Sequence, residues 1–313
     1  MADSTDLALY DRVAQETAAL VIRRYSTSFG LASRLLGADV RHHVENIYAL
    51  VRIADEIVDG VAAGANVRSD EIAALLDALE RETDDAIRRG YSTNLVVHAF
   101  AATARASGFG TELTAPFFAS MRMDLSATLH TPQSFRDYVY GSAEVVGLMC
   151  LRAFLRGAPV DAATDARLVD GARRLGAAFQ KVNFLRDLAA DYRTLGRSYF
   201  PDVDVTTFGE ADKHRLLDDI DDDLRASAAV IPLLPPSSRR AVALAQGLFA
   251  ELAARLRGTP ARSLLDERVR VPNPVKLRIA AAAAAGRPPR SSSLSERRSP
   301  ASVRSVRAGR HSP

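Results

Sequence analysis

Residues 180–191 read Gln-Lys-Val-Asn-Phe-Leu-Arg-Asp-Leu-Ala-Ala-Asp, and the predicted fold is built around this stretch. On a helix, which turns about 100° per residue, its polar residues share one face and apolar side chains occupy much of the remainder. The members of this stripe are Gln180, Asn183, Asp187 and Asp191. Two carboxylates one turn apart, at Asp187 and Asp191, cannot be buried without compensation. The pair needs a cation, a neighbouring arginine or a wet cavity, and a hard divalent metal ion would suit it.

A second polar stripe lies within residues 39–59, where the steps between polar residues are four, three and four. These residues share one predicted helical face, opposite an apolar one: Tyr48, Arg52, Asp55 and Asp59. Taken alone, Asp55 and Asp59 also fit the solvated side of an amphipathic helix. Two carboxylate pairs that face each other across a cavity would instead hold Mg²⁺, which prefers carboxylates, phosphate oxygens and retained waters. The two stripes together therefore favour the handling of a diphosphate.

The composition favours a helical protein with a large core. The chain has 313 residues, of which 47% are hydrophobic and only 6% aromatic, and Ala, Leu and Arg dominate. Cys150 is the only cysteine, which excludes an internal disulfide and a cysteine-based metal site. The N-terminus does not resemble a secretory signal, and no stretch approaches the roughly 18 uninterrupted apolar residues of a membrane span. We expect a cytoplasmic protein, with peripheral attachment to the membrane as an alternative.

Hydrophobic periodicity predicts a succession of helices and no strand, so the expected fold class is all-α. The predicted helices span 7–25, 39–59, 69–89, 93–107, 111–129, 134–156, 164–194 and 238–257, and a last one ends at Ala285. Residues 60–66 and 196–201 are predicted loops. Small residues within 134–156 predict a close approach by another helix or by a long apolar ligand. Five aspartates within 217–224 imitate a metal site but spread widely around the helix, so we interpret them as a solvated face.

A hydroxyl-rich patch at residues 25–29 allows two interpretations. Ser26, Thr27 and Ser28 precede an apolar segment, where hydroxyls and backbone N–H groups can hold phosphate. The same pattern is typical of an ordinary helix N-cap.

The basic character of the chain belongs to its C-terminal tail. Residues 286–313 contain seven Arg and one Glu, whereas the rest of the chain is slightly acidic. Pro, Ser, Arg and Gly leave little to bury, so the tail is predicted to be disordered, after an all-helical domain over residues 1–285. Without interleaved aromatic residues the tail does not favour nucleic-acid binding.

Several motifs in this order resemble the bacterial phytoene and squalene synthases, which condense prenyl diphosphates head to head. The resemblance covers about residues 17–280. Its anchors are Tyr25–Phe29, Tyr48-x3-Arg52-x2-Asp55-x3-Asp59, Tyr138-x-Tyr140-Gly141-Ser142-Ala143 with Val146-Gly147, Gln180-x2-Asn183-x2-Arg186-Asp187-x3-Asp191, and residues 196–201. The resemblance implies a single-domain helical bundle of the isoprenoid-synthase type around a central cavity.

The resemblance also implies the roles of individual residues. Mg²⁺, with Mn²⁺ as an alternative, would be held by Asp55, Asp59, Asn183, Asp187 and Asp191. Diphosphate oxygens would meet Ser26, Ser28, Arg52, Gln180, Arg186 and Arg268. Tyr48 and Tyr138 would line the site near the carbocations. Three positions depart from many relatives: Glu56 replaces a second Asp of the first motif, Tyr25 stands where some relatives have His, and Phe249 replaces a Tyr.

The activity that the resemblance implies is a phytoene synthase of carotenoid biosynthesis. Two geranylgeranyl diphosphates would condense through a cyclopropylcarbinyl diphosphate, without NADPH. Ser33, one turn after Phe29, would leave room for the longer C20 chain. Squalene or dehydrosqualene synthesis from two C15 farnesyl diphosphates is the first alternative. A catalytically silent relative that acts as an interaction protein, and a head-to-tail prenyltransferase or terpene cyclase, are the others.

Overall fold

The computed structural model of the protein describes residues 4–126, 129–195 and 199–286, with the backbone alone for residues 4, 63 and 191–195. These residues form helices and no strand, which confirms the predicted fold class. The helices in chain order are α1 (Ser4–Tyr25), α2 (Thr27–Ser33), α3 (Ala38–Val58), α4 (Val61–Gly64), α5 (Ser69–Arg89), α6 (Leu95–Ser107), α7 (Thr111–Asp124), α8 (Pro132–Val139), the π-helical turn η1 (Tyr140–Glu144), α9 (Val145–Leu155), α10 (Ala162–Leu195), α11 (Glu210–Val230), the 3₁₀ turn η2 (Ile231–Leu233), α12 (Pro236–Gly258), α13 (Ala261–Leu264) and α14 (Asn273–Ala284).

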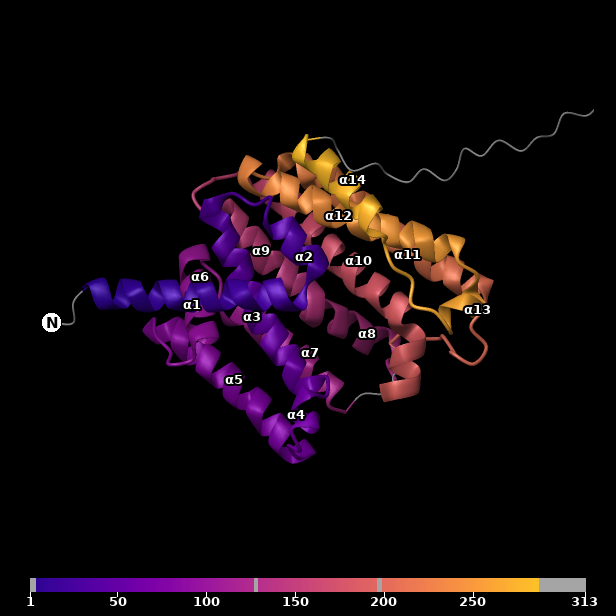
Figure 1. Ribbon diagram of the computed structural model, residues 1–313, viewed down its shortest axis with the longest axis horizontal. Helices are drawn as coiled ribbons and strands as arrows, with labels where there is room; N and C mark the ends of the chain where they lie inside the picture. Colours follow the sequence, from indigo (N-terminus) through magenta and orange to yellow (C-terminus); the bar gives the residue numbers. More distant parts are fainter. Residues whose placement is uncertain (1–3, 127–128, 196–198, 287–313) are drawn as a thin grey trace, which may run out of the picture.

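The helices pack in two groups joined by α10 (Figure 1). In the first group α1 lies against α3 and α6, and α5 lies against α6 and α7. In the second group α12 lies between α11 and α14. The long helix α10 contacts α11 and α12 on one side and η1 and α9 on the other. Because α10 has neighbours on several sides, its sequence shows a polar stripe within an apolar surround instead of a simple two-sided pattern.

Two predicted segments differ in detail from the structure. The predicted loop at residues 60–66 contains the single-turn helix α4. The predicted helix over 134–156 is interrupted by η1, where five residues wind as a π-helix between α8 and α9. Such turns add a residue to a helix and change the phase of its side chains, a change that the hydrophobic period alone does not reveal.

The small residues in this region allow helices to approach each other closely. A Cβ atom added to Gly141 would lie 2.2 Å from the carbonyl oxygen of Pro116 in α7. A Cβ atom added to Gly176 of α10 would lie 2.4 Å from the carbonyl oxygen of Ala143. The close approach predicted from the sequence is therefore made by neighbouring helices.

One described segment, Pro132–Leu155, is long and apolar enough by composition to cross a membrane, with a mean hydropathy of 1.3 over its most apolar window. In the structure 56% of that window is buried inside the protein. The segment comprises α8, η1 and α9, which pack against α7 and α10. It is a core element of the bundle.

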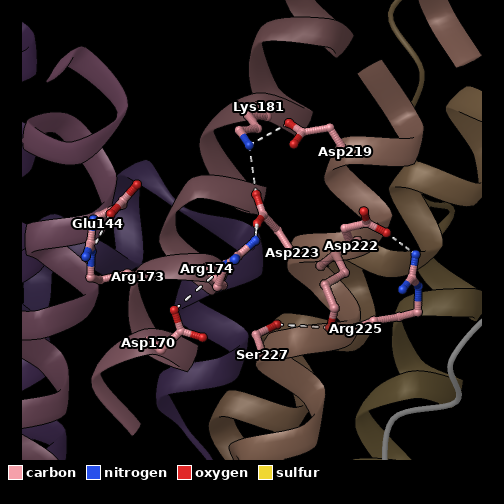
Figure 2. Close-up of polar contacts among 11 residues, drawn as sticks. Glu144, Asp170, Arg173, Arg174, Lys181, Asp219, Asp222, Asp223, Arg225 and Ser227 are labelled. Atoms are coloured by element: carbon pink, nitrogen blue, oxygen red, sulfur yellow. Dashed lines mark hydrogen bonds and ion pairs between the residues drawn. The ribbon is translucent and has the colours of Figure 1, made fainter. Parts of the chain in front are cut away.

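The acidic run at 217–224 is not uniformly solvated, so our interpretation of it is wrong for one residue. Asp223 is 3% exposed. Its carboxylate accepts hydrogen bonds from Lys181 Nζ at 2.8 Å and from Arg174 at 2.9 Å, both of α10 (Figure 2). Asp219 is exposed and binds the same Lys181. The helical wheel could not reveal that this edge of α11 faces cationic residues of α10.

Candidate active site

A large cavity of about 1260 Å³ lies between the two groups of helices. Residues of α2, α3, α7, α9, α10 and α12 and of the segment 268–276 line it. Its polar lining includes Ser26, Ser28, Tyr48, Arg52, Asp55, Asp59, Asp124, Tyr138, Gln180, Asn183, Arg186, Asp187, Tyr199 and Arg268. The cavity thus brings together every site residue singled out in the sequence except Asp191, whose side chain lies outside the described part of the chain. The two polar stripes share this cavity, as their spacing predicted.

The stripe on α3 holds two carboxylates at the end of the helix. Asp55 is half-buried, and Asp59 is the exposed C-cap residue of α3. Burial, and next the neighbouring charge of Asp59, raises the pKa of Asp55 to about 8. Arg52 forms an ion pair with Glu56, and its guanidinium lies 4.6 Å from the centre of the Tyr25 ring. Glu56, which replaces an aspartate of the family motif, therefore forms an ion pair with an arginine of the same helix.

The raised pKa of Asp55 is the observation that tests whether a cation fits. A carboxyl group that resists ionisation because of burial and a like charge is stabilised as a carboxylate when a divalent cation binds beside it. Within the described residues, no three His, Cys, Asp or Glu side chains gather closely enough to hold an ion by themselves. The site offers one pair of carboxylate ligands on α3 and further oxygen ligands on α10. That donor set suits Mg²⁺, which typically takes one or two carboxylates and completes its shell with phosphate oxygens and waters.

On α10, Asp187 is already compensated by arginines. Asp187 accepts a hydrogen bond from Arg186 Nε at 3.0 Å and forms an ion pair with Arg268 Nε at 2.7 Å. Arg268 reaches it from the irregular segment that follows α13. Asn183 and Gln180, respectively one and two turns before Asp187 in α10, line the same cavity. The two sides of the cavity thus differ, with mutually repelling acids on α3 and an arginine-bound acid on α10.

The hydroxyl-rich patch caps a helix and also lines the cavity. Ser26 is the N-cap residue of α2, and its Oγ accepts a hydrogen bond from the backbone N–H of Phe29 at 3.0 Å. This contact confirms the N-cap interpretation for Ser26. Ser26 and Ser28 both line the cavity.

Beyond the polar region the cavity is apolar. Phe29, Phe179 and Phe249 form an aromatic cluster in which the Phe179 and Phe249 rings stack with centroids 3.9 Å apart. Ser33 is buried on the cavity wall, where its hydroxyl donates to the Gly30 carbonyl oxygen at 3.1 Å. Farther along, the lining is aliphatic and aromatic, with Leu36, Leu151, Phe154, Leu168 and Leu234. This lining suits long hydrocarbon chains.

Sequence reasoning missed Asp124, the last residue of α7. It is 7% exposed, lines the cavity and accepts the hydroxyl of Tyr138 at 2.8 and 2.9 Å. Burial, and next the charge of Asp124, raises the pKa of Tyr138 well above its ordinary value. The only signal in the sequence is one acid within an otherwise apolar helical face, and it does not indicate a partner 14 residues away.

Comparison with known proteins agrees with this architecture. The family model described as squalene/phytoene synthase matches residues 22–274. The chain is 30% identical over 187 residues to a 15-cis-phytoene synthase of Paracoccus sp., which covers 59% of each chain. It is 28% identical over 289 residues to the phytoene synthase of Mycobacterium tuberculosis, covering 85% of this chain and 88% of the relative.

A solved dehydrosqualene synthase has the same fold. It matches with a TM-score of 0.74 at 24% identity and covers 88% of this chain and 97% of its own. A squalene synthase of Alicyclobacillus acidocaldarius matches with a TM-score of 0.67 at 22% identity, covering 80% and 95%. Together with the match over residues 22–274, these likenesses show that the chain belongs to the squalene/phytoene synthase family of prenyltransferase enzymes.

Proposed function

We propose that the protein is a phytoene synthase that condenses two geranylgeranyl diphosphates head to head, by way of a cyclopropylcarbinyl diphosphate, in carotenoid biosynthesis. The observation that carries this proposal is a shared cavity that joins two carboxylate-bearing helices to a long apolar lining. The relatives named phytoene synthase support the C20 substrate. The small side chain of Ser33 on the cavity wall also favours a longer chain.

The charged residues would hold the two diphosphates at the polar end. Asp55, Asp59, Asn183, Asp187 and Asp191 would hold Mg²⁺, or Mn²⁺ in its place. When bound, the metal supplies Lewis-acid stabilisation of the charge on the departing diphosphate. Arg52, Gln180, Arg186, Arg268, Ser26 and Ser28 would contact the same diphosphate oxygens. Positive charge placed where negative charge develops lowers the barrier to ionisation.

The apolar part of the cavity would protect the allylic cation that remains. The clustered rings of Phe29, Phe179 and Phe249 would face the hydrocarbon chain of the substrate. Aromatic faces stabilise a nearby cation and exclude water. Tyr48 and Tyr138 also line the cavity and would lie near the carbocation. The double bond of the second substrate would then attack the cation. Proton loss, without a hydride donor, would end the reaction.

The substrates and the place of action follow from this chemistry. The partners are the two prenyl diphosphates, and no nucleic acid is expected. The compartment we propose is the cytoplasm, with peripheral contact to the membrane that receives so apolar a product. The domain over residues 1–285 would carry all of these activities.

The test is an assay of the purified protein with each prenyl diphosphate. Geranylgeranyl diphosphate and Mg²⁺ alone should yield phytoene, and NADPH should be neither required nor able to change the product. Consumption of farnesyl diphosphate alone would identify a dehydrosqualene synthase, and squalene formed only with NADPH would identify a squalene synthase. If neither substrate turned over, the catalytically silent alternative would replace our proposal.

A further inference from the structure

Asp124 is a buried acid for which the proposed contacts to metal and diphosphate provide no role. It lies at the C-terminal end of α7, is 7% exposed and reaches the cavity wall beside Tyr138. A buried carboxylate is unfavourable unless hydrogen bonds or charges compensate it, and such groups are concentrated at functional sites. Its position in the cavity wall therefore makes Asp124 a candidate for a role in the reaction.

Among the described contacts of Asp124, the two shortest are made by one phenol. Tyr138 Oη lies 2.9 Å from Oδ1 and 2.8 Å from Oδ2 of Asp124, so its hydroxyl is shared between both carboxylate oxygens. The hydroxyl of Tyr199 lies farther away, 3.4 Å from Oδ1. Contacts of 2.8 and 2.9 Å are typical of strong hydrogen bonds to a charged acceptor, whereas a contact of 3.4 Å is weak.

The surrounding rings keep Tyr138 in this orientation. Tyr138 is 3% exposed, and its ring centre lies 5.8 Å from that of Phe184, 5.4 Å from that of Tyr199 and 5.2 Å from that of His130. Phe184 and Tyr199 stack with centroids 4.0 Å apart. The phenol cannot swing away without disturbing this cluster, so the direction of its O–H bond is set by Asp124.

The direction of the Tyr138 O–H bond determines which part of the hydroxyl group faces the cavity. A tyrosine hydroxyl has one proton to donate and two electron pairs with which to accept. Because the proton is donated to Asp124, the electron pairs remain for whatever lies in the cavity. A hydrogen bond to a carboxylate also increases the negative charge on the phenol oxygen. An electron-rich oxygen stabilises a carbocation nearby, whereas a hydroxyl proton directed at the cation would repel it.

We propose that Asp124 is a positioning residue for Tyr138, which holds the phenol so that its oxygen, and not its proton, faces the reacting hydrocarbon. The inference rests on the proposed function, because it requires a carbocation in the cavity. No proton is transferred in this role. Asp124 acts through Tyr138 and makes no contact with substrate.

The decisive variant is Asp124→Asn, which keeps the shape of the side chain but removes its charge. The amide can turn its NH₂ group toward Tyr138 and leave the hydroxyl proton free to point into the cavity. We expect kcat to fall about 10- to 100-fold, the size of effect seen when the partner of a functional group is lost. KM should stay within about twofold, because the diphosphate contacts are untouched. Products in which water has captured the cation should increase as a share of the total.

A double-mutant cycle separates positioning from a general structural effect. If Asp124 acts through the phenol, Asp124→Asn should have no further effect on kcat in a Tyr138→Phe background. Ser120→Ala is the matched control, since Ser120 lies one turn earlier in α7, is 1% exposed and donates its hydroxyl to the Phe117 carbonyl oxygen at 2.7 Å. This control should keep the wild-type kcat. If Asp124→Asn folds poorly, Asp124→Ser gives the same test with a smaller polar side chain.

Four outcomes would overturn the inference. Wild-type kcat in Asp124→Asn would show that the charge has no role. If Asp124→Asn lowered kcat by the same factor in the wild-type and Tyr138→Phe backgrounds, Asp124 would not act through the phenol. A large rise in KM would likewise show that Asp124 acts on substrate binding. A wild-type protein inactive on both prenyl diphosphates would remove the proposed function and this inference together. An active wild type with any of the first results would remove the inference alone.

Discussion

At the scale of single residues, the two sides of the cavity differ in how their acids are compensated. Asp55 and Asp59 repel each other, and the pKa of Asp55 is raised to about 8 by burial and then by Asp59. Asp187, by contrast, lies between Arg186 and Arg268. A cation that entered the cavity would relieve the repulsion on α3 and would compete with Arg186 and Arg268 for Asp187. The arginines displaced in this way could turn to the diphosphate.

Removing the charge of one acid on each side should therefore abolish turnover without unfolding the protein. Asp187→Asn and Asp59→Asn keep the side-chain volume, and we expect each to lower kcat by about 100-fold or more. Circular dichroism and the melting temperature should remain close to those of the wild type. Asp170→Asn is the control, because Asp170 also lies on α10 but is exposed, and its one ion pair among the described residues is with Arg174 at 3.8 Å. Near-normal activity in either site variant at saturating substrate would end the metal assignment for that residue.

A second residue-scale prediction concerns His43 on α3. Burial, and next the charge of His42, lowers the pKa of His43 from 6.5 to about 4. The unfolded chain therefore binds a proton between these values that the folded protein does not, and stability falls as the pH drops from about 6.5 to 4. In His43→Asn the melting temperature should depend less steeply on pH over this window. His214→Asn, at an exposed position of α11, serves as the control. An unchanged slope in His43→Asn would contradict the assignment.

At the scale of helices, the contact between α10 and α11 depends on the buried Asp223. Burial alone would lower the pKa of Lys181, but Asp223 and Asp219 hold it above its ordinary value. Asp223→Ala would leave Lys181 and Arg174 without this carboxylate, and we expect a loss of about 3 kcal/mol in unfolding free energy. The exposed neighbour Asp222, which pairs only with Arg225 among the described contacts (Figure 2), is the control. Asp222→Ala should change stability by less than about 0.5 kcal/mol in chemical denaturation.

The approach of α10 to the π turn yields a second helix-scale prediction. In Gly176→Ala the new methyl group would lie 2.4 Å from the Ala143 carbonyl oxygen, and backbone atoms cannot yield as a side chain can. We expect a loss of about 1 to 3 kcal/mol by overpacking. Gly258→Ala, at the end of α12, meets no atom within 4 Å and should stabilise by about 0.5 kcal/mol. Equal melting temperatures in the two variants would show that α10 and η1 can move apart to accept the methyl group at no cost in stability.

The helical period predicted the two stripes because it depends only on spacing within one helix, and the need to compensate their carboxylates together with the family resemblance predicted that they share a cavity. It could not predict Asp124 as a partner of Tyr138, or Asp223 as a partner of Arg174, because those contacts depend on how separate helices meet. In the sequence, the segment of α11 that contains the buried Asp223 looks the same as an acidic segment that is exposed to solvent throughout. Only tertiary packing distinguishes Asp223 from Asp222 next to it.

At the scale of the whole molecule, the all-helical architecture and its central cavity follow from the sequence, whereas the limits of the domain stay a prediction. Residues 287–313 lie outside the part of the chain that the structure describes. Their composition of Arg, Ser, Pro and Gly provides few groups to bury. Truncation after Gly286 should leave the melting temperature unchanged, as measured by calorimetry. A drop of several degrees would show that the tail packs on the domain.

The π turn between α8 and α9 makes the site depend on the number of residues as well as on their identity. One extra residue in a helix shifts everything that follows by about 100° around the axis. Deleting any one residue from 140–144 would restore regular winding and rotate Tyr138 relative to Val146, although both line the cavity now. Substitutions alone cannot undo this arrangement. A lineage that lost the inserted residue would have to rebuild the whole wall of the cavity, so the insertion is expected to be inherited with the activity.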